Sequence, residues 1–154
     1  MSAVLEYSFN IRPMDESDLD SVMEVEPHAY DYPWTMGIFH DCLRVGYSCW
    51  VLENKNAELE GYGVMSMGAG EAHILNLTVR PESQGQGFGK MLLNHFIETA
   101  RSYHLDTLLL EVRPSNKAAV ALYANSGFNE VGVRRNYYPA GKGREDALIM
   151  AFSL

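Results

Sequence analysis

A glycine-rich loop between a predicted strand and a predicted amphipathic helix restricts the fold of this chain more than any other feature. Gly85, Gly87 and Gly89 alternate shortly after an apolar segment that ends at Val79. Apolar residues then recur at helical spacing and predict a helix over residues 87–103, and the apolar segment 107–112 predicts a buried strand. A strand, a loop, a helix and a strand in this order require a right-handed crossover.

The remaining elements indicate the α/β class. Strands are expected over residues 48–53, 61–67 and 72–79, and the short turns between them mean that they run antiparallel. Further strands are expected near residues 7–12, 130–134 and 147–152, and further helices over 16–26, after Thr35 and over 116–126, with Asp15, Thr35 and Ser115 as caps. We therefore expect a mixed sheet of six to seven strands with helices on both faces. No linker or repeat divides the chain, so residues 1–154 should form one domain.

The net charge of the chain indicates which kinds of molecule it can bind. Twelve Lys and Arg against twenty Asp and Glu give a net charge of −8. Such a surface argues against direct nucleic-acid binding, because it offers no broad basic face to phosphates. A basic peptide or a cationic amine would be attracted instead. The sequence carries no signal for an oligomeric state.

Other features exclude several further classes. The apolar stretches, such as residues 108–110, are far shorter than the ~20 residues that a membrane helix needs. The first residues lack a signal-peptide pattern, so we expect a cytoplasmic protein without membrane association. Cys42 and Cys49 form no redox or metal motif and are interpreted as small core residues. The five histidines show no paired ligand spacing, so no metal is expected.

The glycine loop has the composition of an anion-binding site. Without a Cβ, its backbone N–H groups can close around a phosphate at the start of a helix. A Walker loop would need glycine at Gln84 and Ser or Thr at Met91, and a dinucleotide fingerprint would need glycine at Lys90 or Leu92. Neither pattern fits. A flexible turn without a ligand remains the alternative.

The segment QGQGFG, residues 84–89, matches the Q/R-x-x-G-x-G/A signature of the GCN5-related N-acetyltransferases. The chain resembles this family over essentially its whole length. The resemblance implies acetyl-CoA as co-substrate, with its pyrophosphate on the loop and its thioester along the preceding strand, where a backbone N–H would hold the oxyanion. The residues implied in cofactor binding are Leu77, Thr78, Val79, Gly85, Gln86, Gly87, Phe88, Gly89, Lys90 and Asn116. Many family members carry arginine where this chain has Gly85, and the missing side chain is expected to weaken cofactor binding.

Downstream motifs resemble one branch of this family more closely. LEVR at residues 110–113, RRNYYP at 134–139 and GREDA at 143–147 are similar to the bacterial RimI-type enzymes, which acetylate the N-terminal alanine of a small-subunit ribosomal protein. The resemblance implies a basic ribosomal protein as acceptor, direct attack in a ternary complex, and an acceptor groove flanked by Trp34, Tyr137 and Tyr138. The alternatives are another amine (a protein lysine, a polyamine or an antibiotic) and a CoA-binding module without turnover.

Two side chains are candidates for the proton transfers. Glu111 interrupts an apolar strand, where a carboxylate is costly unless it is paired or functional. It is either a general base or an exposed carboxylate paired with Arg113 or Arg134, and the resemblance favours the base. Tyr123 on the helix 116–126 is either a core aromatic residue or, as the resemblance implies, the acid that protonates the leaving thiolate. His73 is a weaker alternative base.

Overall fold

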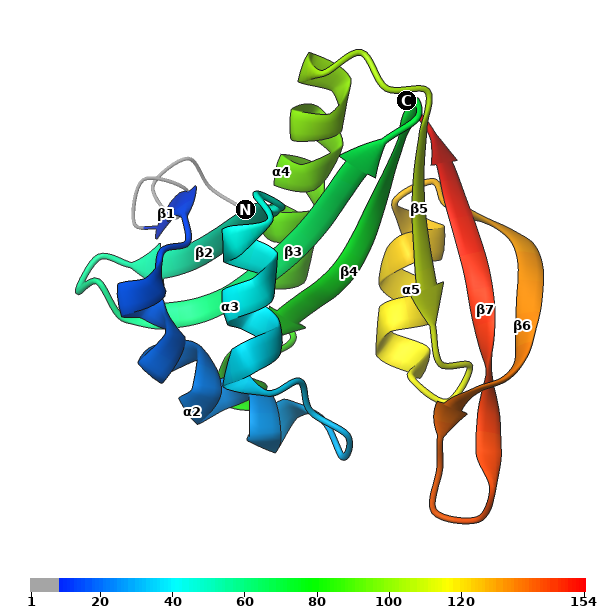
Figure 1. The fold of residues 1–154 in the computed structure, drawn as a ribbon, viewed down its shortest axis with the longest axis horizontal. Coiled ribbons are helices and arrows are strands. Elements are labelled where there is room, and N and C mark those ends of the chain that lie inside the picture. The colour runs from blue at the N-terminus through cyan, green and yellow to red at the C-terminus, as the bar shows by residue number, and fades with distance from the viewer. Residues whose placement is uncertain (1–8) are drawn as a thin grey trace.

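The computed structural model describes residues 9–154, and within this range the chain forms one seven-stranded sheet (Figure 1). Residues 7 and 8 of the expected first strand lie outside the described residues. The strands are β1 (Phe9–Pro13), β2 (Ser48–Asn54), β3 (Leu59–Gly68), β4 (Glu71–Val79), β5 (Thr107–Val112), β6 (Asn129–Pro139) and β7 (Arg144–Ser153). The helices are α2 (Leu19–Ala29), α3 (Met36–Arg44), α4 (Phe88–Ser102) and α5 (Lys117–Asn125), with short 3-10 turns η1 (Glu16–Asp18) and η2 (Pro81–Ser83).

The sheet is mixed, as the sequence predicted. Its strand order is β1-β2-β3-β4-β5-β7-β6. Only β4 and β5 run parallel among these strands, and α4 makes the crossover between them. All other neighbouring strands of residues 9–154 are antiparallel.

Two helical layers cover the two faces of the sheet (Figure 1). On one face, α2 and α3 bury a cluster that includes Val22, Phe39 and Tyr62. On the other face, α4 and α5 pack over a larger cluster that includes Phe96 and Leu110. Helices on both faces confirm the expected architecture.

Local signals placed most helix ends correctly. Thr35 caps α3 as expected. Asp15 accepts a hydrogen bond from the Ser17 N–H (2.8 Å), but it caps the 3-10 turn η1, and α2 begins at Leu19 and not at residue 16. The cap of α5 is Asn116 and not Ser115, because the Asn116 Oδ1 accepts from the Ala119 N–H. α2 also runs past the expected end at residue 26, since a proline in the last turn removes only one backbone hydrogen bond.

Both cysteines are buried, unpaired thiols, as expected. Cys42 and Cys49 belong to the core beneath α2 and α3. Burial raises the pKa of both thiols, that of Cys49 to about 12, so the reactive thiolate is disfavoured. In the described part of the chain, no helix has the length and apolar character that a bilayer crossing requires.

Candidate active site

The candidate site lies where β4 and β5 separate at the centre of the sheet. Their pairing ends at Ile74 and Leu110, and the two strands then diverge (Figure 1). β4 also has a bulge at Leu75. Ile74 and Asn76 pair with consecutive residues of β3, so Leu75 between them has no partner on that strand. The bulge places the side chains of Leu75 and Asn76 on the same face, toward α2.

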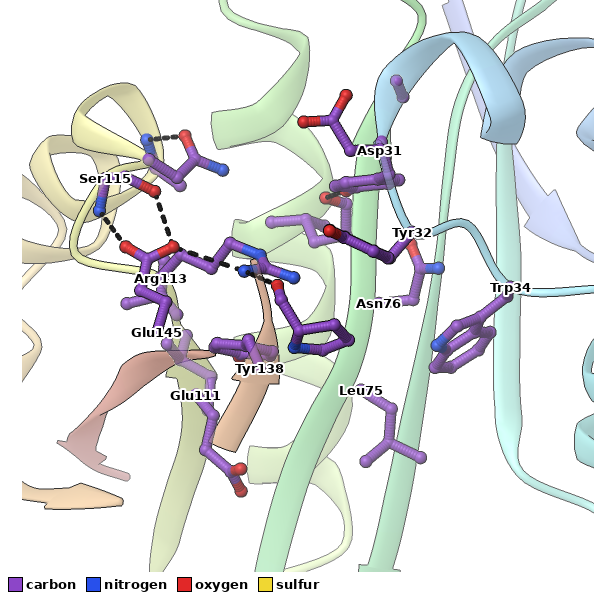
Figure 2. Close-up of a pocket in the computed structure, with 18 of the residues that line it drawn as sticks. Asp31, Tyr32, Trp34, Leu75, Asn76, Glu111, Arg113, Ser115, Tyr138 and Glu145 are labelled. Atoms are coloured by element: carbon purple, nitrogen blue, oxygen red, sulfur yellow. Dashed lines mark hydrogen bonds and ion pairs between the residues drawn. The ribbon is translucent and has the colours of Figure 1, made fainter. Parts of the chain in front are cut away.

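A cavity of about 790 Å³ fills this gap. Its walls come from β4 and β5, the segment after α2, the start of α5 and the β6–β7 hairpin (Figure 2). The residues predicted from the sequence that line it are Trp34, Leu77, Glu111, Asn116, Tyr123 and Tyr138. The fold therefore brings together side chains from opposite ends of the chain.

Glu111 is a nearly buried carboxylate in the wall of the cavity. Its side chain is 9% exposed, and its Oε1 lies 3.2 Å from the His73 Nε2. Its Oε2 lies 3.4 Å from the Arg134 Nε but has no hydrogen bond within the described residues. Arg113, the other expected partner, pairs with Glu145 instead. Glu111 thus has one buried oxygen that lies near a guanidinium but accepts no hydrogen bond within the described residues.

Tyr123 lines the same cavity from α5. Its side chain is buried, and its ring packs against Phe128 at 5.7 Å between centroids. Burial raises the pKa of the Tyr123 phenol well above its usual range, and the nearby Tyr30 and Tyr138 add to the shift. The phenol therefore stays protonated at neutral pH and can donate a proton. Tyr123 packs in the core and also lines the cavity, so its position is compatible with both interpretations that the sequence left open.

A buried polar network that the sequence analysis missed supports the α2 side of the cavity. Glu26 is 1% exposed. Its Oε1 accepts hydrogen bonds from the Tyr62 hydroxyl (2.6 Å) and the Asn76 Nδ2 (3.3 Å). Its Oε2 accepts from the Trp34 backbone N–H (2.9 Å). One carboxyl group thus connects α2, two strands and the segment that carries Trp34.

The network continues along β4. The Thr78 hydroxyl donates to the Asn76 Oδ1 (2.6 Å) and lies 2.7 Å from the Tyr30 hydroxyl. The Tyr30 hydroxyl donates to the Leu77 carbonyl (3.2 Å). These contacts hold the strand in place beyond the bulge, where β5 no longer pairs with it.

The sequence does carry a signal for this network. Glu26 follows Leu19 and Val22 at helical spacing, so it falls within the apolar stripe of α2. A carboxylate on the buried face of a helix requires hydrogen-bond partners. The pattern indicates burial, but it cannot name partners on other elements.

The opposite wall is organised around Arg113 (Figure 2). Its guanidinium lies 4.4 Å from the Tyr138 ring centroid and 5.5 Å from that of Tyr32. It also donates to the Pro139 carbonyl (2.8 Å) and to Glu145 (3.3 Å). Arg113 thereby connects the segment after α2 with the β6–β7 hairpin across the cavity.

Tyr137 and Tyr138 lie in β6, which runs beyond the strand expected near residues 130–134. The β6–β7 register is irregular between Arg134 and Tyr138, and Asn136 has φ +52°. Because the pairing is interrupted here, the sequence of β6 lacks the continuous alternation of apolar and polar residues that predicts a long strand. Tyr138 lines the cavity, whereas Tyr137 is 47% exposed and lies over Arg134, at 5.7 Å.

The glycine loop presents backbone N–H groups at the start of α4. Gly85 and Gly87 have φ of +80° and +89°. The first hydrogen bond of the helix runs from the Met91 N–H to the Gly87 carbonyl (3.1 Å), which leaves the preceding N–H groups without helical acceptors. A Cβ on Gly89 would lie 3.2 Å from the Leu122 side chain, so glycine lets α4 and α5 approach closely. Such a loop fits a phosphate ligand.

The other loop residues divide between core and surface. Phe88 is buried and packs against Phe9, with ring centroids 4.7 Å apart, and Val79 packs in the same cluster. Gln86 and Lys90 are exposed. The loop lies outside the cavity wall, but the last residues of β4 connect the two. Within residues 9–154, no three His, Cys, Asp or Glu side chains gather as a metal site would require.

Comparison with known proteins identifies the family. The acetyltransferase (GNAT) family profile matches residues 11–128. The chain belongs to this family. GNAT acetyltransferases use acetyl-CoA as co-substrate, and the glycine loop of this chain is suited to its phosphates.

Individual relatives agree with this assignment. The chain is 38% identical to the [ribosomal protein bS18]-alanine N-acetyltransferase of Escherichia coli K12, over 94% of this chain and 97% of that protein. The crystal structure of the ribosomal-protein-S18-alanine N-acetyltransferase from Escherichia coli superposes with a TM-score of 0.87, covering 94% of this chain and 93% of the other. A spermidine N-acetyltransferase chimera from Vibrio cholerae shares the GNAT fold at 19% identity, with a TM-score of 0.82 and 95% of each chain covered. The fold alone therefore does not identify the acceptor.

Proposed function

We propose that this GNAT enzyme transfers the acetyl group of acetyl-CoA to the N-terminal α-amino group of a basic ribosomal protein that begins with alanine. The observation that supports the proposal is the cavity between β4 and β5, which Glu111 and Tyr123 both line. The names of the relatives that match most of the chain point to the same acceptor.

The donor would bind along β4 and the start of α4. The backbone N–H groups of residues 85–90 would hold the diphosphate, and Lys90 would add a positive charge at the rim. Beyond Ile74, the backbone groups of β4 that face β5 have no partner strand, and Leu77 lies in the cavity wall. One of these N–H groups would hold the oxyanion. The Asn116 side-chain NH₂ is available for the cofactor, because the cap of α5 uses only the side-chain oxygen.

Two proton transfers would accompany the acetyl transfer. A free α-amino group has a pKa of ~7.7–8.0, so much of it is protonated at neutral pH and needs a base. Glu111 would take that proton, and Tyr123 would give one to the departing thiolate. Positioned acids and bases typically contribute ~10²–10⁴-fold. Cys42 and Cys49 lie outside the cavity wall and have raised pKa values, which favours direct attack without an acyl-enzyme.

The acceptor would enter between Trp34 and Tyr138, which line the cavity from opposite sides (Figure 2). Asp31 and Glu145 also line the cavity, and the chain carries a net charge of −8. A basic peptide would be attracted to this site.

The test compares three acceptors with acetyl-CoA: a basic peptide that begins with alanine, the same peptide with a blocked N-terminus, and spermidine. We expect efficient acetylation of the first acceptor alone. Equal rates for the free and the blocked peptide would refute N-terminal specificity, and a preference for spermidine would assign the enzyme to polyamines. Glu111→Gln and Tyr123→Phe should each lower kcat by about 10²-fold. Tyr103→Phe, which alters an exposed tyrosine at the end of α4, serves as a control.

A further inference from the structure

The His73 side chain contacts the Glu111 side chain from the neighbouring strand. The two residues come from the parallel strands β4 and β5, in the part where the strands still pair and His73 is opposite Leu109. The His73 Nε2 is 3.2 Å from the Glu111 Oε1. Glu111 lines the cavity, whereas His73 does not. The imidazole therefore contacts the candidate base from outside the acceptor site.

The His73 side chain is more exposed to solvent than the Glu111 side chain. The His73 side chain is 35% exposed, and the Glu111 side chain is 9% exposed. Because Glu111 is nearly buried, a proton that it takes up while substrate fills the cavity would have little access to bulk water. Through His73, the same proton has a route to solvent.

The other groups around Glu111 cannot carry this proton. Arg134 lies 3.4 Å from the second carboxylate oxygen, and a guanidinium stays protonated in proteins. Burial, together with the charge of Glu111, raises the pKa of Tyr137 and raises that of Tyr138 to about 12. Both phenols therefore keep their protons at neutral pH. Among these neighbours in the described structure, only the imidazole of His73 has one ring nitrogen that can accept a proton and another that can donate one.

We propose that His73 is a positioning residue that passes the proton of the acceptor amine from Glu111 to solvent. The proposal rests on the function proposed above. Glu111 removes one proton from the ammonium group, and its carboxyl O–H then gives that proton to the neutral imidazole at Nε2. The imidazolium then releases the proton at Nε2 to water, so the ring is neutral again with Nε2 able to accept the next proton, and Glu111 is again a carboxylate. Protons and charge balance, and no further reactant is needed.

The kinetic test uses His73→Asn with the alanine-starting peptide. We expect kcat to fall roughly tenfold with little change in KM. This fall is smaller than that expected for the base Glu111, because His73 acts through Glu111 and does not contact the amine. Added imidazole should restore kcat, because a small buffer can take the proton in place of the missing ring. The matched control is His40→Asn, which removes an exposed histidine paired with Glu16 at 3.4 Å outside the cavity wall and should behave as wild type. An unchanged kcat, or a loss that imidazole does not restore, would overturn the relay.

A second measurement does not depend on turnover. In wild type and in Glu111→Gln, the ring nitrogens of His73 are observed by NMR at the same neutral pH. We expect the His73 Nε2 signal to differ between the two proteins, because the variant replaces the carboxylate that lies 3.2 Å from this nitrogen with an amide. Identical signals would refute the relay even if the alanine peptide proved not to be the acceptor. A wild-type enzyme that ignores this peptide while the His73 signals respond would refute the proposed acceptor and support the contact.

Discussion

The hydrogen bond between Tyr62 and Glu26 offers a quantitative test of the buried network. Both side chains are at most 1% exposed, and the Tyr62 hydroxyl donates to the Glu26 Oε1 at 2.6 Å. Tyr62→Phe keeps the aromatic ring, which packs edge-on against Phe39 at 5.8 Å. The substitution leaves that oxygen with one donor, the more distant Asn76 Nδ2 at 3.3 Å. A buried acceptor that loses a partner costs about 1–3 kcal/mol.

Urea and thermal unfolding measure this cost directly. For a chain of this size, each kcal/mol corresponds to a fall in Tm of about 2–4 °C. Tyr47→Phe, at a tyrosine that is 41% exposed, is the matched control and should change the free energy of unfolding by less than ~0.5 kcal/mol. A double-mutant cycle with Glu26→Gln should show coupling of more than ~0.5 kcal/mol. If Tyr62→Phe matches the control, or if the two changes simply add, the network does not stabilise the fold in this way.

Three further predictions concern the loop, an ion pair and the thiols. Gly87→Ala should raise the KM for acetyl-CoA and leave kcat nearly unchanged, because φ at Gly87 is +89° and a Cβ there costs about 1–2 kcal/mol; an unchanged KM in steady-state assays would contradict the phosphate site. The Arg12 guanidinium, 2.6 Å from Asp18, lowers the pKa of that carboxyl, so Asp18→Asn should lower the free energy of unfolding at pH 7. This loss of stability should shrink as the pH falls below about 4 and vanish below the lowered pKa. A loss that does not depend on pH in urea unfolding would contradict the prediction. Cys42 and Cys49 should react with a thiol reagent only after denaturation, and rapid labelling of the native enzyme would show that the core opens.

Most of the fold was predictable because it depends on local patterns. The strand 107–112 has the bounds expected from its apolar run, and α4 differs from its expected bounds by one residue at each end. Caps such as Asp15 and Thr35 act within a few residues of their own position, so the sequence contains their whole cause. The glycine loop likewise placed the start of α4 to within one residue.

The details of the site depend on contacts between distant segments. The bulge at Leu75 arises from the β3–β4 register, which no local pattern encodes. The contact of His73 with Glu111 depends on the parallel register of two strands separated by α4. The sequence could propose Glu111 from its unusual setting, but it could not rank His73, Arg134 and Arg113 as its neighbours. The pairing of strands that are distant in the sequence determines which of these residues contact Glu111.

The separation of β4 and β5 also affects how the enzyme behaves at high concentration. Strand edges without partners normally invite other chains to add strands, which leads to aggregation. Here the unpaired edges face each other across an interior cavity, because β3 and β7 occupy the opposite edges of the two strands. Tyr32, Arg113 and Tyr138 lie across the space between them. The enzyme can thus keep free backbone groups ready for a ligand without offering them as a template for self-association.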